Sequence, residues 1–364
     1  MPVVLALVLL LCAVPSAAQT VVYPVEFIYT TVKEYPTLMA TEPQREAADR
    51  VEDLNRNLGA ASYGNKIAFT RSRTVVHHLS TLSVADIIGT ANYCATFRSR
   101  MNNAAQALTP FVSTNPKTIR VYVWPANAGS GCYPTASVGG TVINTPVWTS
   151  FVHEVGHILG WPHARALVRN GTSLVTREYG DVFDGMGGGS WNGYGRLFQP
   201  KPSSKLQLGW FDATHRLDTV TTSQTVTLIP YETQDPGLKA IRIRRTEYVQ
   251  VFGRPNPTAV HHDLFINYMA GAQTNPGVPL RSGVQLDLDL GPGERWTLPI
   301  GVPHREPLGT GNVTLTLISQ TPTEAVVLID FEGTTPVPPA TPPTPSVSVG
   351  PALPPTPIVT AVPQ

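Results

Sequence analysis

Residues 153–163 read His153-Glu154-Val155-Gly156-His157-Ile158-Leu159-Gly160-Trp161-Pro162-His163, which is the pattern H-E-x-x-H-x-x-G-x-x-H. Side chains four positions apart lie on the same face of a helix, so His153 and His157 present their imidazoles side by side. Gly160 can adopt the left-handed backbone that ends a helix, and Pro162 cannot continue one. The chain therefore turns back and brings His163 towards the first two histidines. This spacing predicts that three imidazoles bind one metal ion.

Three imidazoles are typical ligands of zinc, and they leave a fourth position for water, as in a catalytic rather than a structural site. Zinc lowers the pKa of that water towards about 7 and polarises a substrate carbonyl. Glu154 lies roughly 100° round the helix from His153. It can reach the water without being a ligand, which predicts a general base. The alternative, coincidental matches on a buried helix, is expected in on the order of one in 10⁵ chains.

The extended motif is the signature of the metzincin metalloproteases. Three further segments follow it in order: Glu178-Tyr179-Gly180-Asp181, Asp184-Gly185-Met186-Gly187 and Leu208-Gly209-Trp210. With them the chain resembles the gametolysin family, extracellular peptidases known from green algae. The resemblance runs from about residue 22 to about 332 and is strongest over residues 119–210. It implies a zinc endopeptidase whose substrates are proline-rich glycoproteins of the extracellular matrix or cell wall.

The resemblance also implies a tight turn with a methionine beneath the zinc ligands, and Met186 lies among glycines that such a turn would use. Met186 would then be a floor and not a ligand, although a plain glycine-rich loop is the alternative. Metzincins that use a tyrosine near zinc carry it two residues after this methionine, where this chain has Gly188. Tyr194 lies eight residues after it, so no catalytic tyrosine is assigned. Asp181 is interpreted as a structural hydrogen-bonding group.

Residues 1–18 form an apolar stretch that is short for a membrane span and ends in small residues, which predicts a secretory signal peptide. Because no Lys or Arg precedes the stretch, an uncleaved anchor is the alternative. No other segment approaches the length of a span, so no membrane span is expected in the mature chain. The net charge is +1 with 14% charged residues, which gives no electrostatic case for nucleic acid. We expect a secreted protein of the extracellular matrix or cell wall.

Removing the signal peptide also removes Cys12 and leaves Cys94 and Cys132. An even pair in an exported chain favours one disulfide. A cysteine that caps the zinc is less favoured, because neither lies in an N-terminal pro-segment, and two separately buried thiols are the remaining alternative. Asn170 and Asn312 begin N-x-T sequons, so a glycoprotein is expected.

We predict an α+β fold whose metzincin-like catalytic domain, residues 19–215, is a mixed twisted sheet plus helices. Strands are predicted at 25–29, 67–78 and 119–124, and helices at 41–59 and 83–108. Residues 137–142 are expected to form an antiparallel edge strand above the cleft, which in the resembled family binds extended substrate. His77 and His78 are adjacent on a strand and face opposite ways, so they are interpreted as structural.

Residues 216–333 change to a period of two, which predicts an all-β sandwich-like domain. Its strands are expected at 225–229, 239–244, 284–290, 313–317 and 325–329. Asp287 and Asp289 share one face of a strand and are interpreted as its solvated side rather than as calcium ligands. Residues 334–364 are rich in proline and are expected to be a disordered tail that favours polyproline II.

Two functional hypotheses follow. The first is a zinc endopeptidase in which His153, His157 and His163 hold the ion and Glu154 is the base. The second is a catalytically inactive, zinc-containing matrix-binding protein that acts through its β-domain and tail. Glu154 favours the first, because a structural site has no need of a base.

Overall fold

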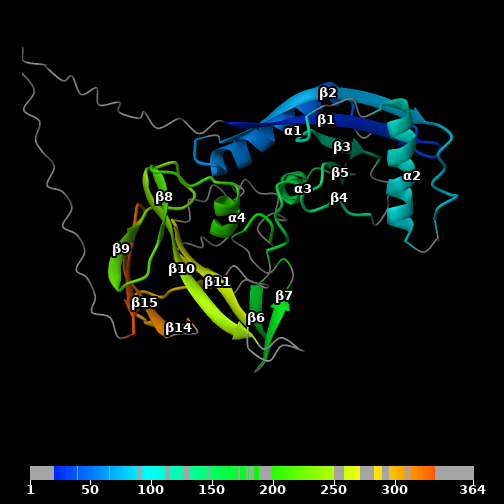
Figure 1. Cartoon of the computed structure of the whole chain (residues 1–364). Helices are drawn as coiled ribbons and strands as arrows, with labels where there is room; N and C mark the ends of the chain where they lie inside the picture. The colour runs from blue at the N-terminus through cyan, green and yellow to red at the C-terminus, as the bar shows by residue number, and fades with distance from the viewer. Residues whose placement is uncertain are drawn as a thin grey trace, which may run out of the picture.

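The structure is a computed structural model. It describes residues 20–332 with gaps at 39, 65, 89–91, 111–114, 126–131, 146–147, 149, 165, 171–172, 178, 180–183, 188–198, 250–257, 271–282, 289–294 and 309–310. Figure 1 shows an N-terminal part of one sheet with helices and a C-terminal part built mostly of strands, with α4 (Pro202–Gln207) between them. The expected signal peptide and proline-rich tail lie outside the described residues. Within the described ranges, no helix is long and apolar enough to cross a membrane.

The N-terminal part is built on a five-stranded mixed sheet with the order β2-β1-β3-β5-β4. β1 (Val21–Val32) pairs in parallel with both β2 (Ile67–Leu79) and β3 (Ile119–Val123), and these strands overlap the predicted ones. β5 (Val142–Thr145) continues the parallel order. β4 (Thr135–Ala136) forms the antiparallel edge.

Side chains of β1 alternate between two cores, because successive residues of a strand face opposite sides of the sheet. Phe27 and Tyr29 belong to the core that also contains residues of α1 (Pro43–Leu54) and α3 (Phe151–Ile158). Ile28 belongs to the other core, which includes Phe97, Met101 and Ala105 of α2 (Tyr93–Leu108). Both faces of the sheet are therefore covered, and α3 lies on the face that α1 also covers.

The structure moves the end of the first predicted helix and the start of the second, while the second ends at Leu108 as predicted. Gly59 does not end the first helix, which passes from α1 into a π-helical turn, η1 (Asn55–Gly59), and continues to Ala61. The second helix, predicted from residue 83, begins only at Tyr93. Residues 84–88 form turns instead, and the Glu34 carboxylate accepts hydrogen bonds from the Val84 amide and the Ser83 hydroxyl. A carboxylate distant in the sequence thus accepts the hydrogen bonds of groups that were expected at the N-terminus of the helix.

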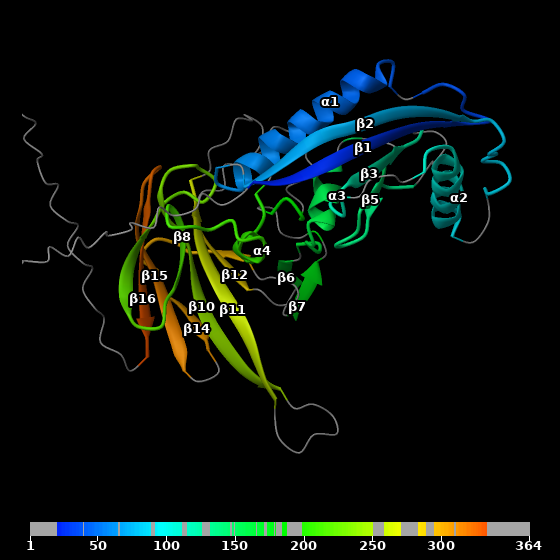
Figure 2. The same cartoon turned by 45° about the horizontal axis from the view of Figure 1, so that its top comes forward.

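Two segments near the cleft also differ from expectation. The edge strand β4 precedes the predicted 137–142 range, and residues 138–139 form a turn before β5, although the antiparallel orientation of this edge is confirmed. The predicted strands also do not include the hairpin of β6 (Ala166–Asn170) and β7 (Ser173–Arg177), which follows His163. In both views the hairpin lies below α3, on the same side of it as β10 (Gly237–Val249) and β11 (Thr258–Met269) (Figures 1 and 2).

Cys94 and Cys132 form a disulfide, as predicted. The bond joins α2 to the segment that leads into β4, and Cys132 directly precedes Tyr133 of the cavity described below. His77 and His78 contact the hydroxyls of Thr109 and Thr31 respectively, so the two side chains have different partners.

Removing this disulfide is expected to lower the free energy of unfolding. The bond closes a loop of 38 residues. Loop-closure entropy for this length corresponds to about 4 kcal/mol, an upper value because the unfolded chain keeps some structure. A Cys94→Ser, Cys132→Ser double variant should therefore melt at a lower temperature than the parent in thermal denaturation without reductant. Peptide mapping that found two free thiols in the secreted parent would contradict the expectation.

The C-terminal part contains two sheets with the orders β13-β12-β11-β10-β8 and β14-β15-β16-β9. Every pairing in them is antiparallel except that of β8 with β10. One core contains residues of both sheets, such as Ile241 and Ile266 from the first and Leu315 and Val327 from the second. Their strands are β8 (His215–Thr219), β9 (Gln224–Leu228), β10 (Gly237–Val249), β11 (Thr258–Met269), β12 (Gly283–Leu288), β13 (Arg295–Thr297), β14 (His304–Pro307), β15 (Asn312–Gln320) and β16 (Ala325–Phe331).

Each strand predicted for this region overlaps an observed one, while β8, β11, β13 and β14 were not predicted. The interpretation of Asp287 as solvated is wrong, because its side chain is buried within the first sheet. Asp289 lies outside the described residues. Alternation predicted that this face of β12 is exposed to solvent, but Gln285 and Asp287 on it are both buried.

The two parts meet through aromatic rings around one lysine. Tyr63 donates its hydroxyl hydrogen to the carbonyl of Tyr231 at 2.7 Å and stacks on His215 with ring centroids 4.8 Å apart. Lys205 of α4 places Nζ 3.8 Å from the ring centroids of both Tyr63 and Tyr231. Burial lowers the pKa of Lys205 well below its usual range. The C-terminal sheets are thus packed against the part that carries α3.

Candidate metal centre

Helix α3 carries the first half of the motif and ends as the sequence predicts. Gly160 has a φ of +94°, the left-handed backbone that glycine adopts without strain. The amide of Trp161 donates to the carbonyl of Gly156 at 3.1 Å, and the amide of Gly160 donates to that of His157 at 2.9 Å. These two bonds define a Schellman motif, which satisfies the last carbonyls of the helix and reverses the chain. His163 returns to the face of the helix for this reason.

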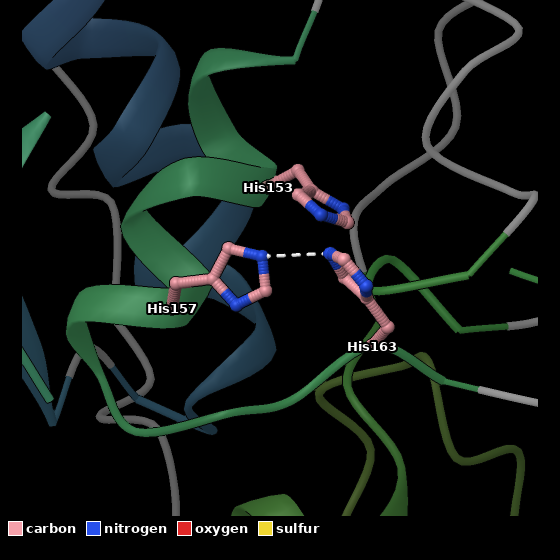
Figure 3. A group of neighbouring side chains, drawn as sticks. All are labelled: His153, His157 and His163. Carbon is pink, nitrogen blue, oxygen red and sulfur yellow. Dashed lines mark hydrogen bonds between the residues drawn. The ribbon is translucent and has the colours of Figure 1, made fainter. Parts of the chain in front are cut away.

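The three histidines converge on one point, as Figure 3 shows. Their candidate ligand nitrogens all lie within 4.8 Å of one another. Nε2 of His157 is 3.0 Å from Nε2 of His163. Two imidazoles bound to one zinc ion at about 2.0–2.1 Å in tetrahedral geometry would place these nitrogens roughly 3.3 Å apart. The His157–His163 spacing therefore fits a shared metal ion closely.

The outer nitrogens of the two helical histidines are held by backbone carbonyls. Nδ1 of His157 donates to the carbonyl of Trp161 at 2.7 Å, and Nδ1 of His153 donates to that of Gly185 at 3.2 Å. Because Nδ1 carries the hydrogen, Nε2 of each ring keeps its lone pair for the centre of the cluster. This is the tautomer that a metal ligand needs.

Burial keeps both helical imidazoles neutral. It lowers the pKa of His153 to about 4, with the neighbouring His157 adding to the effect, and it also lowers the pKa of His157. A metal ion binds neutral imidazole, so protons compete with it less at this site than at an exposed one. The donor set, its tautomers and its spacing fit a zinc ion.

Met186 lies directly beneath the helix, at a position that only glycine permits. A Cβ added to Gly156 would lie 2.3 Å from Sδ of Met186, so a side chain there would displace the methionine. Met186 is buried, and its amide donates to Oδ1 of Asp184 at 2.6 Å. The turn that contains Met186 also supplies the Gly185 carbonyl to His153. Met186 therefore packs against the helix at Gly156, between the positions of His153 and His157.

Glu154 is 6% exposed and lies in the same cavity as the three histidines. Burial raises the pKa of its carboxyl to about 7, and a hydrogen bond from the Ala136 amide of β4 opposes the rise. The carboxylate is consequently more basic than an exposed one, which suits a group that accepts a proton near neutral pH.

Glu154→Gln is expected to stabilise the protein in the presence of a zinc chelator above pH 7. A carboxyl whose pKa rises from 4.5 to about 7 on folding binds more protons when folded, so stability falls as pH rises between these values. The glutamine removes that loss, which reaches at most about 3 kcal/mol. Thermal denaturation from pH 4 to 8 should show the two proteins diverging with rising pH. Parallel curves would contradict the raised pKa.

A cavity of about 830 Å³ opens over the cluster. β4 forms one side of it through Thr135 and Ala136, and the exposed side chains of Tyr133 and Val138 lie at its edge. The amide of Gly139 donates to the carbonyl of His157 at 2.7 Å, which ties the β4–β5 connection to the helix. The sheet edge, the carboxylate and the histidines are thus joined in one site.

Tyr179 also lines the cavity, and sequence reasoning did not predict it. Its hydroxyl lies 2.8 Å from Nε2 of His163, and their ring centroids are 4.0 Å apart. The segment that contains Tyr179 contributed to the sequence analysis only through the family resemblance. A tyrosine near the metal was considered only after Met186, at the position of Gly188 and at Tyr194, and none was assigned. Those two residues, like Asp181, lie outside the described residues.

A comparison with models of known protein families found no match, and a comparison with curated proteins found none either. The family assignment therefore rests on the motif residues, and it stays a proposal.

Proposed function

We propose that the chain is a secreted zinc endopeptidase. His153, His157 and His163 would hold the ion, and Glu154 would act as the general base. The observation that carries this proposal is the placement of a buried carboxylate of raised pKa in one cavity with three convergent imidazoles, two of them held neutral. A site that only bound metal for structure would close its fourth position and would not need the carboxylate.

Zinc, when bound, polarises a carbonyl and makes water acidic enough to attack at neutral pH. The residues of the chain move the proton and orient the groups that react. Glu154 accepts the proton of the attacking water and then donates it to the amine that leaves. The Ala136 amide holds the carboxylate from the β4 side, so the base is oriented towards the cavity.

The exposed edge of β4 suits an extended peptide substrate. β4 pairs on one side with β5, so its other side can accept a further strand through main-chain hydrogen bonds. Such binding reads little side-chain identity. The apolar groups of Tyr133 and Val138 would contact the peptide near the reacting bond.

The substrate class comes from the resemblance to gametolysins, which implies proline-rich glycoproteins of the extracellular matrix or cell wall. A secreted enzyme agrees with the disulfide of Cys94 and Cys132, since such bonds persist in oxidising compartments. We further propose that residues 19–215 form the catalytic domain and residues 216–333 a sandwich-like domain.

Incubation of the purified protein with a denatured protein and with proline-rich wall extract tests the function. We expect cleavage of the denatured protein that stops when a zinc chelator is added and returns with added zinc. Preference for the wall extract would support the substrate class. Binding to wall material without any cleavage, with zinc present, would contradict the proposal and favour the inactive matrix-binding protein.

A further inference from the structure

Tyr179 contacts the cluster of three histidines at Nε2 of His163, the atom that would bind a metal ion. Nε2 of His163 lies 2.8 Å from the Tyr179 hydroxyl and 3.0 Å from Nε2 of His157. An imidazole nitrogen has one lone pair or one hydrogen at this position. When His163 gives a lone pair on Nε2 to a metal ion, that nitrogen can no longer share a hydrogen with the Tyr179 hydroxyl, whichever of the two was the donor.

The structure holds Tyr179 close to the cluster independently of that hydrogen bond. Its ring centroid lies 4.0 Å from that of His163 and 5.9 Å from that of His153. The β6–β7 ladder begins with the pair Ala166 and Arg177, so the hairpin brings the chain after Arg177 back to the segment that carries His163. The ring therefore stays beside the site when the hydroxyl changes partner.

The backbone of Tyr179 supports a functional role. Its φ is +57°, a left-handed conformation that is uncommon for residues other than glycine. Such a conformation costs free energy and persists where the surrounding structure imposes it, often at functional sites. Here it directs the side chain into the cavity that Glu154 also lines. One cavity thus contains a proton acceptor and a neutral hydrogen-bond donor.

We propose that the Tyr179 hydroxyl donates a hydrogen bond to the oxygen of a ligand at the metal site. If the proposed peptidase function holds, on which this part of the inference rests, that oxygen belongs to the carbonyl of the scissile bond. Negative charge grows on this oxygen as the bond is attacked, so a donor aimed at it accelerates the reaction. Tyr179 is then a catalytic residue that supplies an O–H donor, and it transfers no proton.

Tyr179→Phe tests the inference because it removes the hydroxyl and keeps the ring beside His163. Acetohydroxamic acid, a small oxygen ligand of zinc, should bind the zinc-loaded variant about 10- to 100-fold more weakly than the parent, as expected for losing a hydrogen bond to a charged group. Peptide hydrolysis should fall about 10²- to 10³-fold in kcat. Tyr23→Phe, a hydroxyl deletion on β1 outside the cavity, should leave both unchanged.

Zinc affinity, measured by competition with a chelator, separates a donor from a ligand. For a donor, Tyr179→Phe should leave the Kd for zinc unchanged or tighten it by up to about tenfold, because the hydroxyl no longer competes for His163. A Kd weakened about 100-fold would overturn the inference and make Tyr179 a metal ligand. Unchanged acetohydroxamate affinity would also overturn it. A parent that hydrolyses no peptide, yet loses acetohydroxamate affinity on Tyr179→Phe, would reject the peptidase and keep the donor.

Discussion

Glu154→Gln is expected to lower kcat/KM for peptide hydrolysis by at least about 10²- to 10⁴-fold while the protein still binds one zinc ion. The glutamine has the size of glutamate and can still accept the hydrogen bond from Ala136, but it cannot accept a proton from water. The three imidazoles are unchanged, so folding and metal content should survive. Steady-state kinetics with metal analysis of the same preparations provides the measurement.

Glu42→Gln is the matched control for this variant. Glu42 lies on the surface before α1, where its carboxylate pairs with Arg45 at 3.3 Å, and exposed pairs of this kind contribute little. Its activity should equal that of the parent. A Glu154→Gln protein that cleaved at the parent rate would refute the role of Glu154 as the base. If Glu154→Gln lost zinc as well as activity, kinetics could not test its role as the base. The pH-dependent stability measured with a zinc chelator would then test whether the pKa of Glu154 is raised.

His157→Ala is expected to abolish both zinc binding and hydrolysis. The substitution removes one of three ligands and also the bond from Nδ1 to the Trp161 carbonyl. Loss of an outer hydrogen-bond partner alone weakens metal sites about 10- to 100-fold, so loss of a ligand should weaken the Kd for zinc by more than 100-fold. Equilibrium dialysis against zinc, followed by metal analysis, would measure this.

His163→Ala separates loss of the metal from damage to the helix, because His163 lies outside α3. It should lose zinc as His157→Ala does, while α3 keeps its own packing. His78→Ala is the control, since His78 contacts Thr31 and is not one of the three convergent histidines. Full zinc content and activity in either His157→Ala or His163→Ala would remove that residue from the site.

The motif could be predicted from the sequence because every step in it is local. Two histidines four apart share a helical face, and Gly160 ends the helix through bonds to Gly156 and His157. In the C-terminal sheets, β9, β10, β12, β15 and β16 could likewise be predicted from alternation and apolar runs, whereas β8, β11, β13 and β14 were missed. The order in which the strands pair could not be predicted, because alternation shows which residues share a face of a strand and does not show which strand is its neighbour.

Errors occurred where a distant residue decided a local structure. A helix was predicted from residue 83, yet the Ser83 hydroxyl and the Val84 amide donate to Glu34, and α2 begins only at Tyr93. Gly59 was expected to end a helix, but the π-helical turn continues through it, with Leu58 and Gly59 buried. Local propensity is a weak preference that tertiary packing overrides.

The sequence by itself determined the three histidines that could hold a metal ion, the end of α3 and the candidate base, because bond geometry over a few residues controls all three. Only the tertiary structure decided that Met186 packs on Gly156, that β4 closes one side of the cavity and that Tyr179 meets His163. These contacts join segments that are far apart in the sequence, and the sequence does not show how close such segments lie in space. Burial, which makes Glu154 basic and keeps His153 neutral, is a property of the whole fold.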